Sequence, residues 1–266
     1  MYKGAEIPIF ALSFRNREEE DPMNDTRRNY AATTARTGGL AIDQGLRQYM
    51  LGVYNYMALA VAGTGLVSLA IASNPEFVQT LARGGVMRWL PFIGILGIGF
   101  IAPRVIFSGS KAAAHGLFWA YAALWGLAIA PMLYYFNQAG LAQEIYKAFF
   151  ITAATFGATS LYGYTAKRDL SGMATFLFMA SIGLIIAMVL NVLIFKSTIM
   201  SLVTSGAVVL VFSAVTAYET QMIKEMYREG SASNERASIF GAFALYGSFV
   251  TLFTHILNIL GIMRSE

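Results

Sequence analysis

The sequence predicts an all-α integral membrane protein, a bundle of seven transmembrane helices. Of its 266 residues, 56% are hydrophobic and only 13% are charged, which is too few polar groups to cover a water-soluble domain. Long apolar runs recur from about residue 50 to the end of the chain. Each run can cross about 30 Å of hydrocarbon at about 1.5 Å per residue. The runs are continuous rather than alternating, which excludes a transmembrane β-barrel.

The apolar runs are separated by short connections, so neighbouring spans should be antiparallel and adjacent. Small residues three or four apart predict close packing between helices, as at Ala153, Gly157 and Ser160 in the fourth span. The predicted spans are 50–73, 89–108, 113–135, 146–166, 173–195, 198–221 and 239–262.

Residues 1–48 differ from the transmembrane domain, which is predicted over 49–266. They carry seven Lys or Arg and seven Asp or Glu without apolar periodicity, as expected of a disordered cytoplasmic tail. The apolar stretch 7–14 is short and lacks a small-residue cleavage site, unlike a signal peptide. Met23 offers an alternative start, in which case residues 1–22 would not normally be translated.

The orientation follows from the basic residues in the connections. With the N-terminus in the cytoplasm, 14 of the 19 Lys and Arg residues lie on the inner side, seven of them in the tail, and five lie outside. Cytoplasmic loops carry the excess of Lys and Arg in multi-pass proteins. We therefore expect the N-terminus inside and, after seven spans, the C-terminus outside.

Glu219 is the residue that most needs an explanation. It ends a long apolar run, and Val215, Val211 and Val208 lie on or near the same helical face. A carboxylate in hydrocarbon is costly unless it is neutral, paired or facing water, so it marks a functional site by default. The alternative is a glutamate already among the headgroups and stabilised by Lys224.

Three further polar residues lie within predicted spans. Arg104, after Pro103, either snorkels to the cytoplasmic headgroups or faces the bundle interior and pairs with Glu219. The simpler interpretation of Asn191 and His255 is that each forms an interhelical hydrogen bond, worth about 1 kcal/mol, rather than acting as a ligand.

Several classes of chemistry are excluded or unsupported. The chain has no Cys, so disulfides and thiolate metal sites are excluded, and its two His leave little room for a His-built metal centre. We find no nucleophile and base at a recognisable spacing, no Walker motif and no zinc motif, and so expect no enzymatic activity, cofactor or resident metal. The net charge of +4 reflects topology rather than nucleic-acid binding.

A family resemblance is carried by three segments. Residues 149–172, FFITAATFGATSLYGYTAKRDLSG, resemble the signature of the Bax inhibitor-1 family, also called the transmembrane Bax inhibitor motif family, in its bacterial branch. Residues 212–224, FSAVTAYETQMIK, resemble the end of the family's sixth span. Residues 244–261, ALYGSFVTLFTHILNILG, resemble its seventh span.

The resemblance implies a bundle in the bacterial inner membrane whose last helix is central and surrounded by six others. It also implies a pH-sensitive calcium leak, in which two acids on the last two spans share a proton and help to close the pore. The first acid corresponds to Glu219, which follows Tyr218 as the family's usual Asp follows Tyr. Where the family commonly has Leu-Asp, this chain has Gly247 and Ser248. Ser248 can donate a hydrogen bond to Glu219 but brings no second charge, so the two-carboxylate gate does not carry over directly.

Two functions therefore compete. The first is a leak for calcium or protons whose pH gate involves Glu219, Ser248 and Arg104. The second is a non-transporting membrane protein that binds a partner, such as the membrane-bound quality-control protease that some bacterial relatives are thought to engage. The tail favours the second, because disordered segments rich in both charge signs often serve in recognition.

Overall fold

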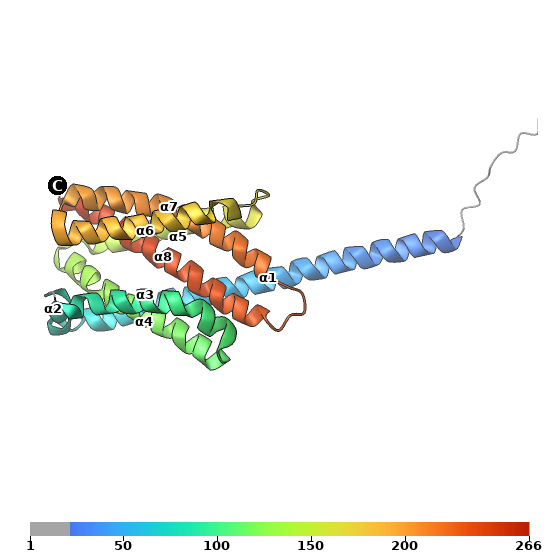
Figure 1. Ribbon diagram of the computed structural model, residues 1–266, viewed down its shortest axis with the longest axis horizontal. Coiled ribbons are helices and arrows are strands. Elements are labelled where there is room, and N and C mark those ends of the chain that lie inside the picture. Colours follow the sequence, from blue (N-terminus) through green and yellow to red (C-terminus); the bar gives the residue numbers. More distant parts are fainter. Residues whose placement is uncertain (1–21, 84, 266) are drawn as a thin grey trace, which may run out of the picture. The chain divides into compact units, whose positions relative to one another are not determined.

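The computed structural model describes residues 22–83 and 85–265, with side chains described from residue 44 to 264 apart from Gly84, and every regular element in these ranges is helical (Figure 1). The α-helices are α1 (Pro22–Ala72), α2 (Pro75–Ala82), α3 (Val86–Ser108), α4 (Lys111–Gln138), α5 (Ala142–Thr165), α6 (Ala174–Leu190), α7 (Thr198–Met226) and α8 (Asn234–Ser265). A 3-10 turn, η1 (Ser171–Met173), precedes α6, and a π-helical turn, η2 (Asn191–Phe195), follows it.

The chain divides into two units between Gln44 and Gly45, close to the predicted boundary at 48/49. The second unit, 45–266, holds the helical bundle. In the stretch predicted as a disordered tail, residues 22–48 form the first part of α1, and residues 1–21 lie outside the described residues. Proline at the first position of α1 and several alanines after it are compatible with a helix there.

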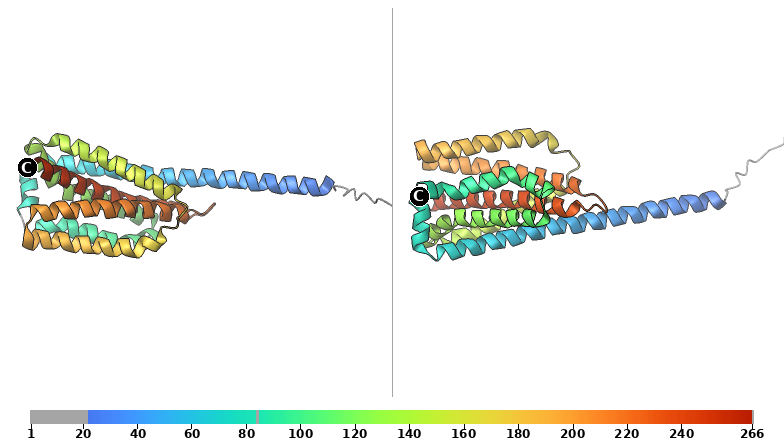
Figure 2. Two further views of the ribbon diagram at one scale, coloured as in Figure 1. Left: turned by 90° about the horizontal axis from the view of Figure 1, so that it is seen from above. Right: turned by 60° about the horizontal axis from the view of Figure 1, so that its bottom comes forward.

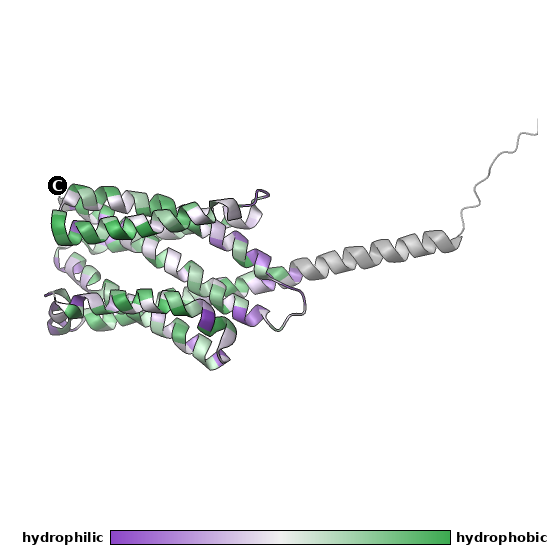
Figure 3. Cartoon of the chain, viewed as in Figure 1, coloured by the Kyte–Doolittle hydropathy of each residue, from purple (hydrophilic) through white to green (hydrophobic). Residues whose placement is uncertain are grey.

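A helix occupies each of the seven predicted spans, and the ends differ by at most five residues except at the first span, where α1 begins at Pro22 instead of residue 50. Within the described part of the chain, six helical stretches are long and apolar enough to cross a membrane: Gln44–Ala72, Val86–Ser108, Lys111–Gln138, Ser171–Phe195, Thr198–Met226 and Asn234–Arg264. Helix α5, at the predicted fourth span, is not among these six. The class of an all-helical, multi-pass membrane protein is therefore confirmed, whereas the count of seven spans is not. Apolar residues cover the helices and polar ones gather at the ends of the bundle (Figure 3).

Local side-chain caps explain several helix starts. The Asn74 side chain accepts a hydrogen bond from Phe77 N at 3.2 Å and is followed by Pro75, which starts the short helix α2 that the hydropathy pattern did not predict. Ser110 caps α4 and Ser197 caps α7 in the same way, at 3.1 and 3.2 Å. Polar caps at these positions allow the chain to turn back within few residues.

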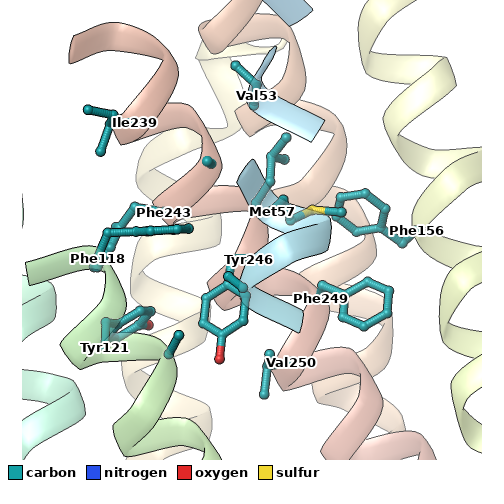
Figure 4. Packing of buried hydrophobic residues seen from close by; sticks show 14 of the residues in the cluster. Val53, Met57, Phe118, Tyr121, Phe156, Ile239, Phe243, Tyr246, Phe249 and Val250 are labelled. Atoms are coloured by element: carbon teal, nitrogen blue, oxygen red, sulfur yellow. The ribbon is translucent and has the colours of Figure 1, made fainter. Parts of the chain in front are cut away.

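Helix α8 forms the centre of the bundle's packing. In its 18-residue apolar stretch 61% is buried, against 11% for the corresponding stretch of residues 171–195, which include α6. Helix α8 contacts α3, α4, α5 and α7 (Figure 2). The core around it is aromatic and aliphatic, and Figure 4 shows Phe243, Tyr246 and Phe249 of α8 among residues of α1, α4 and α5. The Tyr246 hydroxyl bonds to Thr64 Oγ1 at 2.5 Å, and Thr64 in turn donates to Ala122 O at 3.0 Å. These contacts fix α1, α4 and α8 together in the region beside Glu219.

The bundle has two ends, the one at which the C-terminus lies and the opposite one. At the C-terminal end, Arg264 of α8 contacts Glu144 at the start of α5, with 3.1 Å between Nε and Oε1. At the opposite end, where α7 finishes and α8 begins, Lys224 donates to Tyr164 O at 2.8 Å. An ion pair between Lys111 and Glu235 lies at that opposite end as well.

Candidate functional site

The candidate site is built on one contact between α7 and α8. Ser248 Oγ donates a hydrogen bond to Glu219 Oε2 at 2.7 Å. Ser248 is only 2% exposed, and Glu219 is partly buried. The carboxylate therefore points at the most buried helix of the bundle rather than away from it. Of the two sequence alternatives for Glu219, this geometry matches the one in which the acid faces the interior.

Aromatic residues of α4 and α8 lie beside this contact. Tyr121 of α4 lies near this contact, because its hydroxyl is next to Gly247, the neighbour of Ser248. The centroid of its ring lies 4.3 Å from that of Phe243 and 5.7 Å from that of Tyr246. Figure 4 labels these three residues in the core. A Cβ on Gly247 would come within 3.1 Å of the Tyr121 hydroxyl, so glycine leaves space for this phenol next to Ser248. Ser248 thus faces Glu219 of α7, whereas Gly247 faces Tyr121 of α4.

A chain of hydroxyl groups runs from α7 to α1 one residue after Glu219. Thr220 Oγ1 lies 3.0 Å from Ser160 Oγ, and Ser160 Oγ lies 2.6 Å from the Tyr54 hydroxyl. Thr220 and Ser160 are buried. Hydroxyl groups buried in this way need partners, and here they find them across three helices, α7, α5 and α1.

The helices α5 and α7 approach each other closely at Gly163. A Cβ built there would lie 2.1 Å from the backbone oxygen of Ala217, two residues before Glu219. Only glycine allows the two backbones to come so close. The backbone that carries Glu219 is therefore held against α5 by a contact that tolerates no side chain.

The loop between α5 and α6 is clamped to α7 by Gln221, a residue that the sequence analysis missed. Its Nε2 donates to Arg168 O at 2.9 Å, and its Oε1 accepts from Leu170 N at 2.7 Å. Within the loop, hydrogen bonds from the side chain and the backbone N–H of Ser171 hold the pKa of Asp169 below its usual range. The sequence shows only an amide side chain two residues after Glu219 in an apolar run, and nothing in it indicates these partners.

The remaining predicted site residues lie apart from Glu219. Arg104 is exposed, and among the residues with described side chains no ion pair joins it to Glu219. Asn191 closes the turn between α6 and α7, because its Oδ1 accepts from Ser197 N at 3.0 Å and its Nδ2 donates to Ser197 O at 3.1 Å. His255 bonds across helices, with its Nδ1 3.1 Å from Ser205 Oγ. The structure thus brings together Glu219 and Ser248, and it places Arg104, Asn191 and His255 elsewhere.

Comparisons with known proteins agree with the segments that carry the resemblance. A model of the family described as Bax1-I, inhibitor of apoptosis-promoting Bax1, matches residues 46–265. The chain is 34% identical to the inner membrane protein YbhL of Escherichia coli K12 over 224 residues, which cover 83% of this chain and 94% of YbhL. It is 36% identical to protein RP147 of Rickettsia prowazekii over 239 residues, 89% of this chain and 99% of RP147.

Proposed function

The chain belongs to the Bax inhibitor-1 family, and from the hydrogen bond between Ser248 and Glu219 we propose that it is an ion leak of the bacterial inner membrane with its gate at this contact. The name of the Escherichia coli relative, an inner membrane protein, supports the location. Carboxylate and hydroxyl oxygens are ligands that suit calcium, and a carboxylate can also carry a proton. Calcium or protons are therefore the ions proposed.

The hydrogen-bonded acid is the single observation that carries this proposal. A purely structural polar contact in a membrane is usually made by Ser, Thr, Asn or Gln, because an ionisable group there is costly. Glu219 is hydrogen-bonded to a nearly fully buried serine, and the aromatic rings of Tyr121, Phe243 and Tyr246 pack beside that serine's helix segment. Breaking one hydrogen bond between α7 and α8 would free the carboxylate to meet an ion.

Calcium efflux from dye-loaded liposomes tests the proposal. The parent protein should release calcium faster than protein-free liposomes, with a rate that changes between about pH 5 and 8, where a carboxylate in hydrocarbon can titrate. Glu219→Gln should remove that pH dependence. Glu225→Gln is the matched control, since it changes an exposed acid on the same helix and should behave as the parent does.

Three outcomes oppose this proposal or redirect it. Efflux from the parent no faster than from empty liposomes would contradict the leak. Identical pH profiles for the parent and both variants would mean that Glu219 anchors α7 and is not part of a gate. A protease recovered with a non-transporting parent would favour the second candidate, a membrane protein that modulates a partner, which the seven basic and seven acidic residues of 1–48 favour.

We further propose that α5 is a seventh span. It has 24 residues, about 36 Å at 1.5 Å per residue, enough for about 30 Å of hydrocarbon. Its two ends lie at opposite ends of the bundle, Glu144 beside Arg264 and Tyr164 beside Lys224. With seven spans and the excess of basic residues inside, the N-terminus is cytoplasmic and the C-terminus is outside.

Reporter fusions at the two ends of α5 test this topology. A fusion in the turn at Gly140 should report the outer side, and one at Ser171 should report the cytoplasm. A fusion after Glu266 should again report the outer side. Reporters on the same side at Gly140 and Ser171 would show that α5 does not cross the membrane.

A further inference from the structure

Arg104 is a cation inside a membrane-spanning helix, and it has no acidic partner in the described part of the protein. It lies four residues before Ser108, where α3 ends. Its side chain is exposed, and no ion pair between described side chains includes it. An arginine in hydrocarbon is costly unless its head group reaches polar groups, here about 6 Å away at the helix end. The Arg104 guanidinium therefore needs an anion or water at this end of the bundle.

The start of α8 brings a second guanidinium to the end of α3. Arg236 Nη1 donates a hydrogen bond to Phe107 O at 2.5 Å. The rings of Phe107 and Phe240 pack beside this bond, with 5.3 Å between their centroids. Phe107 lies one turn after Arg104 on the same face of α3. The bond to Phe107 uses one of the five donors of the Arg236 guanidinium, and the other donors can bind an anion.

Lys111, the first residue of α4, adds a third cation at this end. It forms an ion pair with Glu235, the residue before Arg236, and both side chains of the pair are exposed. Three positive charges from the ends of α3, α4 and α8 therefore meet one negative charge, which leaves a net charge of +2. The loop before α8 carries Arg228 and Glu229, whose charges cancel. This end of the three helices thus attracts anions.

An apolar strip of α3 leads from these cations into the membrane. Phe100, Arg104 and Phe107 are spaced by four and three residues, so they lie on one face of the helix. Phe100 is 81% exposed and Phe107 is 41% exposed. A phospholipid has its phosphate and its acyl chain in the same order, from the membrane surface inward. A soluble anion would match only the cations, whereas a lipid matches both the cations and the apolar strip.

We propose that Arg104, Lys111 and Arg236, called here the basic cluster, bind the phosphate of an anionic phospholipid whose acyl chain lies along Phe100. Arginine binds phosphate through two parallel N–H donors, and basic sites between membrane helices bind anionic headgroups. The net positive charge favours an anionic lipid, such as phosphatidylglycerol, over the zwitterionic phosphatidylcholine. This site does not depend on the proposed leak, because lipid binding is measured without transport.

Native mass spectrometry of the full-length protein in detergent tests the lipid site, with phosphatidylglycerol and phosphatidylcholine added in equal amounts. The parent should carry more phosphatidylglycerol than phosphatidylcholine. Arg104→Gln should weaken phosphatidylglycerol binding by about fivefold, the effect of one basic residue near a membrane surface. Arg88→Gln is the matched control, since it removes an exposed arginine from the first turn of α3, at the opposite end of that helix, and it should bind as the parent does.

Glu235→Gln should change lipid binding in the opposite direction. It removes the negative charge that lies beside the basic cluster, so binding of phosphatidylglycerol should rise by about fivefold. A variant that fails to fold would not gain affinity, so this increase separates a binding effect from a folding defect. Glu76→Gln is the matched control, because it changes an exposed acid of α2, and it should bind as the parent does.

Four results would overturn the lipid site. The parent could carry the two lipids equally, or Arg104→Gln and Arg88→Gln could lose the same affinity, which would mean that only overall charge matters. Glu235→Gln could bind no more phosphatidylglycerol than Glu76→Gln. Inorganic phosphate in large excess should not displace phosphatidylglycerol, because it has no acyl chain to lie along Phe100. Displacement by phosphate would assign the basic cluster to a soluble anion instead.

Discussion

Gly163→Leu should cause the largest loss of folded protein of any substitution considered for this bundle. A Cβ at Gly163 would lie 2.1 Å from the Ala217 backbone oxygen, so even alanine must push α5 and α7 apart, and leucine must do so by more. Overpacking typically costs about 1–3 kcal/mol, and the cost here should be at the upper end because the obstacle is backbone. The effect is measured by thermal unfolding in detergent, in which the fraction of protein that stays monodisperse is monitored as the temperature rises.

Gly157 provides the control on the same helix. It is exposed, and a Cβ there would meet no atom within 4 Å. Gly157→Ala should leave the unfolding temperature unchanged or raise it slightly, since alanine favours a helix over glycine by about 1 kcal/mol. Gly163→Ala should lower that temperature clearly. Equal unfolding temperatures for the two alanine variants would show that α5 and α7 are not in close contact at Gly163.

Ser248→Asp should make ion efflux much more steeply dependent on pH than in the parent. The substitution replaces the donor that satisfies Glu219 by a second carboxylate at the same place. Two charges about 4 Å apart repel by about 4 kcal/mol at an effective dielectric constant of 20, close to a thousandfold in a binding equilibrium. The pair should therefore keep one proton and titrate as a coupled unit.

The comparison that isolates this effect uses Ser248→Asn. Asparagine is close in size to aspartate and adds no charge, so it should shift the efflux rate without steepening the pH profile. Efflux measured from about pH 5 to 8 separates the two variants. A profile for Ser248→Asp that matches that for Ser248→Asn would mean that the second carboxylate does not share a proton with Glu219.

The helices could be predicted from the sequence because a membrane span needs only length and apolar composition. The faces of those helices could not. Of the three residues of the fourth span predicted to pack, Ser160 is buried, but Ala153 and Gly157 are exposed, and Thr152 and Phe156 are buried in their place. In a bilayer the outward face is as apolar as the core, so hydrophobic periodicity does not distinguish them.

Part of the candidate site could also be predicted from the sequence. Glu219 is conspicuous because an acid in an apolar run is costly, and the family pattern indicated Ser248 as its partner. Gln221 forms its bonds to Arg168 and Leu170 only after the chain has folded, and no local pattern announces them. Asn191 was predicted to bond between helices, but it serves the turn at Ser197, six residues along the chain.

A double-mutant cycle on calcium efflux tests the gate most directly. The rates compared are those of the parent, Ser248→Ala, Glu219→Ala and the double variant, at one pH and one protein density. If Ser248 acts by holding Glu219, removing its hydroxyl should change the rate in the parent and have no effect once position 219 offers no acceptor, so the double variant should equal Glu219→Ala. Effects that multiply independently, or a parent rate equal to that of protein-free liposomes, would contradict a gate at this contact.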